Sequence, residues 1–177
     1  MAKLCNIIVS GSDNIFLIGP MGVGKSTIGM RLAALTDKKF IDSDSEIINS
    51  TGVSIDLIFE IEGEEGFRKR ENRIIAELTA LENIVLATGG GVVLSADNRA
   101  CLKRSGTVIY LKASPEQLLE RTVKDRKRPL LQTDDRLGKI KELLKTRGAL
   151  YEELADIIII TDDRDVKDIV NKIYQKL

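Results

Sequence analysis

Five short apolar segments, rich in β-branched residues, alternate with longer amphipathic segments along this chain of 177 residues. The short segments are apolar at nearly every position, which is typical of strands covered on both faces of a parallel sheet. Their alternation with helices predicts an α/β fold, in which right-handed crossovers place helices on both sides of a parallel sheet. The expected strands are residues 14–19, 38–44, 83–89, 106–112 and 156–161, and the expected helices are residues 25–35, 54–61, 64–82, 96–104, 115–122, 135–154 and 166–175.

The length suits a single domain spanning residues 1–177, with a core of residues 13–177. Residues 1–12 precede the first strand and are expected to form an extra edge strand or a loosely held extension. A charged segment, residues 121–136, contains Pro129 and separates two expected helices. This composition fits a solvated loop, or a mobile lid over a phosphate site.

The overall composition excludes several classes of function. Lys+Arg and Asp+Glu both number 27, so no net field attracts the chain to nucleic acid or to a membrane, and neither partner is expected. The chain has no histidine, which excludes histidine bases and histidine-ligated zinc. The two cysteines are far apart, and the N-terminus has no long apolar core, so we expect a cytoplasmic protein.

The sequence GPMGVGKST, residues 19–27, matches the phosphate-loop pattern G-x-x-x-x-G-K-[ST]. A strand is expected before it and a helix after it, which is the context that the pattern requires. The glycines allow backbone N–H groups to face phosphate oxygens, and the helix N-terminus attracts the same anion. Lys25 supplies a positive charge to the phosphates and Ser26 a hydroxyl to Mg²⁺. The motif therefore predicts a bound nucleoside triphosphate with magnesium.

Two carboxylates, Asp42 and Asp44, end the second expected strand. Residues two apart on a strand point the same way, so both carboxylates should lie beside the phosphate loop. One can hold magnesium, and the other can orient and deprotonate an attacking hydroxyl. The alternative is an aspartate that caps a helix starting in SEIINSTG. The third strand ends in Gly89–Gly91, which would let a ligand approach the backbone closely.

Three arginines complete the candidate site. Arg147 lies on the apolar stripe of the expected helix 135–154, where a guanidinium is costly unless it meets a carboxylate of the protein or of a ligand. Arg68 lies near the start of the long third helix. Arg128 lies in the charged segment, where it could neutralise charge on a transferring phosphoryl group. The chain has no N-K-x-D guanine-binding motif, which argues against a GTPase.

The segments GPMGVGKST, FIDSD, FRKREN, LATGGGVV, RPLL and RGALYEELAD occur here in the order found in the shikimate kinase family, which this chain resembles from residue 14 onwards. The resemblance implies a nucleoside-monophosphate-kinase-like P-loop fold with strand order 2-3-1-4-5. It also implies ATP-dependent phosphorylation of the 3-hydroxyl of shikimate, on the aromatic amino acid route to chorismate, by a small enzyme expected to be a monomer.

The resemblance also implies roles for individual residues. Nucleotide contacts fall on Gly22, Val23, Gly24, Lys25, Ser26, Thr27, Arg121, Arg128 and Arg164; magnesium contacts fall on Ser26 and Asp42; shikimate contacts fall on Asp44, Arg68, Gly89, Gly90, Gly91 and Arg147. Lys25, Asp44 and Arg128 are the expected catalytic residues, with Asp44 as the base. Two departures are visible. The family's R-x-P-L-Y motif lacks its proline here, at Ala149, and the late loop TDDRDVKD also has no proline.

Two alternatives stay open at the level of sequence. One is another small-molecule kinase of the same fold, acting on gluconate or on a nucleoside monophosphate. Gluconate also carries a carboxylate, so Arg147 alone does not exclude it. The other is a nucleotide-binding module without catalysis, against which the presence of Lys25, Asp44 and Arg128 argues.

Overall fold

The computed structural model describes residues 13–122 and 135–177. Within these ranges a five-stranded sheet has the order β2-β3-β1-β4-β5, and every pair of neighbouring strands is parallel. The strands are β1 (Ile15–Ile18), β2 (Lys39–Asp42), β3 (Ile84–Ala87), β4 (Thr107–Lys112) and β5 (Ile157–Ile160). The helices are α1 (Lys25–Thr36), α2 (Ser43–Thr51), α3 (Ile55–Thr79), α4 (Ala96–Ser105), α5 (Pro115–Thr122), α6 (Arg136–Leu154), α7 (Val166–Tyr174) and the 3₁₀ turn η1 (Val92–Leu94). The predicted strand order is confirmed.

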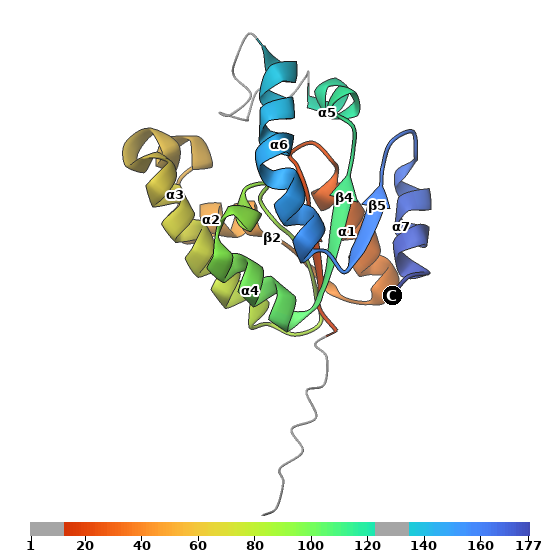
Figure 1. Ribbon diagram of the computed structural model, residues 1–177. Coiled ribbons are helices and arrows are strands. Elements are labelled where there is room, and N and C mark those ends of the chain that lie inside the picture. The colour runs from red at the N-terminus through yellow and green to blue at the C-terminus, as the bar shows by residue number, and fades with distance from the viewer. Residues whose placement is uncertain (1–12, 123–134) are drawn as a thin grey trace, which may run out of the picture.

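Helices cover both faces of the sheet, as the alternation of elements predicts (Figure 1). Residues of α2, α3, α4 and the C-terminal half of α6 form one apolar cluster with one face of the sheet. Residues of α1, α5, α7 and the start of α6 form a second cluster with the other face. The structure is therefore a three-layer α/β sandwich, and its two cores are separated by the sheet.

The strands differ in how completely they are covered. All four residues of β1 and of β3 are buried, because these strands lie inside the sheet and have helices on both faces. The expectation that the strand at residues 156–161 is covered on both faces is wrong. β5 is an edge strand, and Ile158 and Ile160 are 45% and 54% exposed. An apolar run alone does not distinguish an edge strand from a central one.

Two local features differ from the pattern-based assignment, and a third agrees with it. β2 ends at Asp42, and α2 begins at Ser43, so the second strand is shorter than predicted and is followed by a helix. The turn η1 was not predicted. The break expected between helices 54–61 and 64–82 is present as a kink at Gly63, where φ is 68° within α3. The predicted N-terminal extension and residues 123–134, including Arg128, lie outside the described residues.

The side chain of Asn14, just before β1, binds the segments that lead into the two neighbouring strands, β3 and β4. Its side chain is 1% exposed, donates hydrogen bonds to the carbonyls of Leu81 (2.6 Å) and Ser105 (3.3 Å), and accepts one from the N–H of Ile84 (3.1 Å). Ile84 begins β3, and Ser105 ends α4, just before β4. One buried amide thus ties together the amino ends of the three central strands.

Replacing Asn14 with alanine should lower the free energy of unfolding by roughly 2–4 kcal/mol, because it leaves buried backbone groups without partners. Asn49→Ala, at an exposed position of α2, should change it by less than about 0.5 kcal/mol. Urea denaturation of both variants measures the difference. Equal stabilities would show that Asn14 does not hold the three strands together.

Candidate active site

The loop between β1 and α1 is shaped by glycines in the left-handed region. Gly19, Gly22 and Gly24 have φ values of 142°, 78° and 99°. A Cβ on Gly19 would lie 2.4 Å from the carbonyl oxygen of Leu111, and one on Gly22 would lie 2.4 Å from Cγ2 of Thr122. Backbone angle and space therefore both require glycine at these two positions. The loop leads directly into the N-terminus of α1, where N–H groups without helical partners attract anions.

Lys25, the first residue of α1, is folded over this loop. Its side chain is 9% exposed, and its Nζ donates hydrogen bonds to the carbonyls of Gly19 (2.7 Å) and Pro20 (2.8 Å). The loop's own carbonyls thus hold the ammonium group at the mouth of the phosphate-binding turn. A phosphate in that turn would be in direct reach of this charge.

Ser26, Asp42 and Asp44 lie together, although not in the way predicted from the sequence. The hydroxyl of Ser26 donates to Oδ2 of Asp42 (2.6 Å). Oδ1 of Asp42 caps α2 by accepting from the N–H groups of Asp44 (3.0 Å) and Ser45 (3.2 Å). The expected strand geometry for the two aspartates is wrong, because Asp44 belongs to the first turn of a helix. The capping alternative is correct for Asp42, and it coexists with the contact to Ser26.

One cavity, of about 310 Å³, contains both aspartates and the phosphate loop. It lies at the carboxyl ends of β1, β2 and β3, where ligands bind in open parallel sheets. Its lining residues are Gly22, Gly24, Lys25, Ser26, Thr27, Asp42, Asp44, Thr88, Gly90 and Arg121. A phosphate donor site and a pair of carboxylates therefore share one space.

The triple glycine after β3 is enclosed by charged and polar side chains. A Cβ on Gly91 would lie 2.3 Å from Nη1 of Arg68, and one on Gly89 would lie 2.9 Å from carboxylate oxygens of both Asp44 and Glu71. Arg147, 6% exposed, donates from Nη1 to the carbonyl of Gly90 (3.3 Å). The structure thus brings Arg68, Asp44 and Arg147 to consecutive glycines. None of these positions has room for a side chain larger than hydrogen without movement of a neighbour.

Glu71 is a site residue that the sequence reasoning did not single out. It is 1% exposed, and its Oε2 accepts from Nη1 of Arg68 at 2.7 Å. Burial raises the pKa of Glu71; the charge of Arg68 opposes this rise, and that of Asp44 adds to it. The sequence signal that could have identified Glu71 is its position three residues after Arg68, because residues at this spacing on a helix face the same way.

Arg147 lies buried on α6 as its position in the apolar stripe predicts. Among the described residues, no carboxylate lies within ion-pair distance of its guanidinium, although Glu71 is near enough to interact with it electrostatically. We expected Arg147 to meet a carboxylate, either of the protein or of a ligand. Within the described residues, the protein supplies the backbone carbonyl of Gly90 instead. A carboxylate on a bound molecule would complete its environment.

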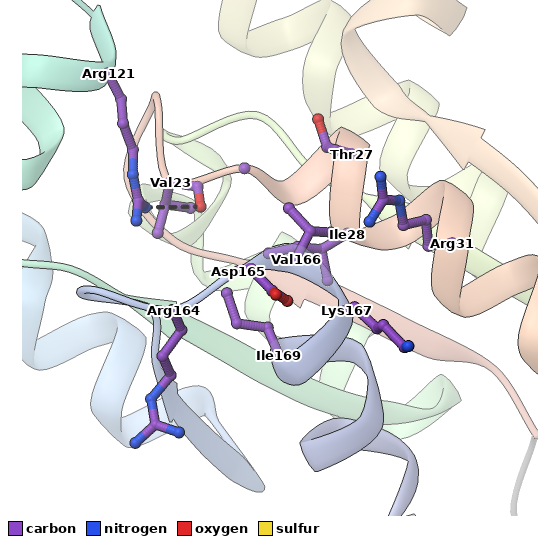
Figure 2. Close-up of a pocket in the computed structure, with 11 residues that line it drawn as sticks. Val23, Thr27, Ile28, Arg31, Arg121, Arg164, Asp165, Val166, Lys167 and Ile169 are labelled. Atoms are coloured by element: carbon purple, nitrogen blue, oxygen red, sulfur yellow. Dashed lines mark hydrogen bonds between the residues drawn. The ribbon is translucent and has the colours of Figure 1, made fainter.

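A second hollow, of about 540 Å³, adjoins the phosphate loop between α1 and α7 (Figure 2). Val23, Thr27, Arg121 and Arg164, which were expected to contact the nucleotide, line it together with Arg31, Asp165 and Lys167, which were not singled out in the sequence. In Figure 2 the guanidinium of Arg164 points away from Thr27 and Ile28. The hollow is wide and partly apolar, as a nucleoside requires.

Arg121 spans this second hollow. It donates to the side-chain and backbone oxygens of Thr161 (3.1 and 2.9 Å) and to the carbonyl of Val23 (3.5 Å). It therefore links the phosphate loop to the residue that follows β5. Arg128, predicted to act on the phosphates, lies outside the described residues.

Two properties of the described residues bear on the type of site. No described helix is long and apolar enough to cross a membrane. Residues 13–122 and 135–177 contain no group of three or more acidic, cysteine or histidine residues arranged to hold a metal ion by themselves. Any divalent cation in the cavity would depend on the ligand for most of its oxygen partners.

Comparison with known proteins identifies the family. The family model described as "Shikimate kinase" matches residues 21–177. A shikimate kinase of Nitrosococcus oceani is 58% identical over 93% of this chain and 86% of its own length, and one of Thiobacillus denitrificans is 54% identical over 96% and 92%.

Solved structures agree with this result. Shikimate kinase from Acinetobacter baumannii, in complex with shikimate, has a TM-score of 0.91 and 47% identity over 93% of this chain and 92% of its own. A gluconokinase from Sinorhizobium meliloti shares the fold, with a TM-score of 0.60, but only 19% of its residues. The chain belongs to the shikimate kinase family.

Proposed function

We propose that Asp44 is the general base for phosphorylation of the 3-hydroxyl of shikimate in the cavity of about 310 Å³. The reaction itself, ATP-dependent phosphorylation of shikimate with Mg²⁺, is that of the family to which the chain belongs. The observation that carries the proposal is the position of Asp44. It lines the cavity with the phosphate loop on one side, and its Oδ1 lies at Gly89, beside the arginine pair, on the other.

The donor half of the site consists of residues 22–27. Backbone N–H groups of Gly22, Val23 and Gly24 and the N-terminus of α1 bind the ATP phosphates, and Lys25 adds a positive charge. Ser26 and Asp42 would hold Mg²⁺, Asp42 through water. This sparse set fits an ion that keeps several waters and binds mainly to phosphates. When bound, Mg²⁺ neutralises charge on the phosphate oxygens.

The acceptor half consists of Arg68, Arg147 and the glycines after β3. Two guanidinium groups adjacent to Gly90 and Gly91 form a clamp for one carboxylate, with planar donors that lysine does not offer. The backbone at Gly89–Gly91 can meet ring hydroxyls because no side chain intervenes. The related protein from Acinetobacter baumannii was solved in complex with shikimate, which supports shikimate as the acceptor molecule of this site.

The base assignment follows from the residues available. The chain has no histidine, and Lys25 is engaged with the phosphate loop. Asp42 is engaged with Ser26 and with the first turn of α2, whereas Asp44 lies at the junction of donor and acceptor halves. A carboxylate at that junction can orient a hydroxyl and take its proton during transfer.

The remaining residues of the site are expected to contact the nucleotide. Arg121 and Arg164 flank the nucleoside, since both line the second hollow. Arg128, from outside the described residues, acts on the phosphates. The phosphate loop, Asp44 and Arg147 lie together within the fold of a single chain, so we infer that a monomer is active. ATP is the donor, so we infer that the enzyme works in the cytoplasm, where ATP is abundant.

A coupled assay of ADP release tests the function directly. With ATP and Mg²⁺, shikimate should be turned over, whereas gluconate and nucleoside monophosphates should not. The carboxylate clamp discriminates against the nucleotides, and the close fit of the glycines discriminates against the open-chain sugar acid. Turnover of gluconate or of a nucleotide, without turnover of shikimate, would contradict the proposed reaction.

Asp44→Asn should lower kcat by about 10²-fold or more, because the amide cannot accept the proton of the hydroxyl. The control is Asp56→Asn, the same chemical change at an exposed position in the first turn of α3. Steady-state kinetics at saturating shikimate and ATP measure both variants. A kcat for Asp44→Asn close to that of the control would remove Asp44 from the role of base.

The burial of Glu71 leads to a separate prediction about how stability depends on pH. Its pKa in the folded protein is raised above the ordinary value of 4.5, chiefly by burial, so the folded state keeps this proton to higher pH than the unfolded state. The contribution of Glu71 to stability is therefore fully present below pH 4.5 and is lost as pH rises through the raised pKa. The stability of the wild type minus that of Glu71→Gln should fall as pH rises from 4.5 to neutrality.

Urea denaturation of both proteins across this pH range measures that difference. Glu60→Gln, at an exposed position on the same helix, controls for the loss of one surface charge. A difference that grows with pH would mean that the bond to Arg68 outweighs burial, and that Glu71 is more stable as a carboxylate in the folded state.

A further inference from the structure

Tyr151 is buried in α6, one turn after Arg147, and points at the triple glycine. Its side chain is 0% exposed, and its ring stacks on that of Tyr110, with 5.0 Å between centroids and 23° between planes. The Tyr151 hydroxyl donates a hydrogen bond to the carbonyl of Gly90. Nη1 of Arg147 donates to the same oxygen at 3.3 Å. Two side chains of one helix therefore share a single acceptor.

Gly90 lies between α6 and the phosphate loop. A Cβ on Gly90 would be 3.3 Å from the backbone nitrogen of Met21 and 3.6 Å from the carbonyl oxygen of Gly19. Gly90 also lines the cavity that holds Asp44 and Lys25. Any rotation of this peptide would therefore move backbone that faces the proposed acceptor, and would change its distance from the donor loop.

We propose that Tyr151 is a positioning residue for the acceptor: its hydroxyl fixes the Gly90 peptide and keeps the guanidinium of Arg147 oriented toward the substrate carboxylate. The proposal rests on the proposed function, because it takes Arg147 and Gly90 to contact the acceptor. Tyr151 itself does not need to touch the substrate. It acts through the carbonyl that it shares with Arg147.

The shared carbonyl explains why the hydroxyl is needed. A carbonyl oxygen has two lone pairs, and here two donors occupy them. If the phenol is removed, the buried carbonyl keeps only the longer bond from Arg147, and the charged guanidinium is the donor able to compensate by moving closer. That movement would draw Arg147 away from a carboxylate ligand, and the substrate would then have to compete with the backbone for it.

The phenol suits this role because it stays protonated. Burial raises the pKa of Tyr151, with the charge of Arg147 acting in the opposite direction, and the net change is upward. The hydroxyl is therefore a donor throughout the pH range in which a carboxylate base can operate. The Gly90 contact should not itself titrate during catalysis.

The test compares Tyr151→Phe with Tyr110→Phe. Both variants remove one hydroxyl from the same stacked pair of buried rings. In the described part of the chain, the Tyr110 hydroxyl makes no hydrogen bond to residues 89–91. Tyr151→Phe should raise the shikimate KM by roughly 3- to 10-fold, the value of about one hydrogen bond, while kcat and the ATP KM change by less than about 2-fold. Tyr110→Phe should leave all three constants unchanged.

A double-mutant cycle separates positioning from a general loss of packing. Arg147→Ala alone should raise the shikimate KM by more than Tyr151→Phe does. In the Arg147→Ala background, adding Tyr151→Phe should raise it by a smaller factor than in the wild type, because the part of the effect that passes through Arg147 is gone. Additive effects, an unchanged shikimate KM in Tyr151→Phe, or equal effects of the two tyrosine variants would each overturn the proposal.

A measurement without turnover distinguishes failure of this inference from failure of the proposed function. Backbone amide NMR spectra of the ligand-free wild type and of Tyr151→Phe should differ most at Gly90 and Gly91. If the wild type failed to phosphorylate shikimate, the proposed function would be wrong, whereas this spectral change would still report the Gly90 contact. Amide signals that are unchanged at both glycines would overturn the positioning role whatever the substrate.

Discussion

The site depends on one conformational constraint, the left-handed glycines that join β1 to α1. β1 is completely buried between two cores, so its position is set by packing. Gly19, Gly22 and Gly24 turn the chain from this fixed strand into the N-terminus of α1 with φ values that other residues rarely adopt. Gly19 also passes within contact distance of the β4 backbone, where a side chain would collide with Leu111. The phosphate site is therefore built from backbone held by the core.

The acceptor side depends on the same backbone. Gly90, at the end of β3, lies against Met21 and Gly19 of the phosphate loop, because β1 and β3 are neighbours in the sheet. The distance between donor and acceptor is thus set by strand spacing and by the absence of side chains on both surfaces.

Much of the fold followed from patterns that are local in the sequence. Apolar runs located the five strands, and the G-x-x-x-x-G-K-[ST] motif located the first βα turn. Features that depend on tertiary contacts could not be predicted from these local patterns. Whether Ile158 and Ile160 are covered depends on the position of β5 at the sheet edge. The end of β2 depends on Asp42, whose one carboxylate serves both Ser26 and the first turn of α2.

The candidate site shows the same division. Isolated charges on apolar faces were visible in the sequence, and Arg147 was found in this way. Glu71 and Tyr151 were harder to find, because a glutamate three residues from an arginine, and a tyrosine in an apolar stripe, each have an ordinary structural explanation. Their importance comes from tertiary contacts, between Glu71 of α3 and Gly89 and between Tyr151 of α6 and Gly90, which the order of residues along the chain does not reveal.

The balance of charge around those glycines explains why an anionic acceptor suits the site. Arg68 and Arg147 bring two positive charges. Asp44, Glu71 and the more exposed Glu64, which pairs with Arg68 at 3.1 Å, bring at most three negative ones. Burial favours the neutral form of Glu71. With Glu71 protonated, Arg68 would keep its pair with Glu64, while Arg147 would have no carboxylate within ion-pair distance among the described residues. Under the proposed function, the carboxylate of the acceptor would supply a negative partner for Arg147.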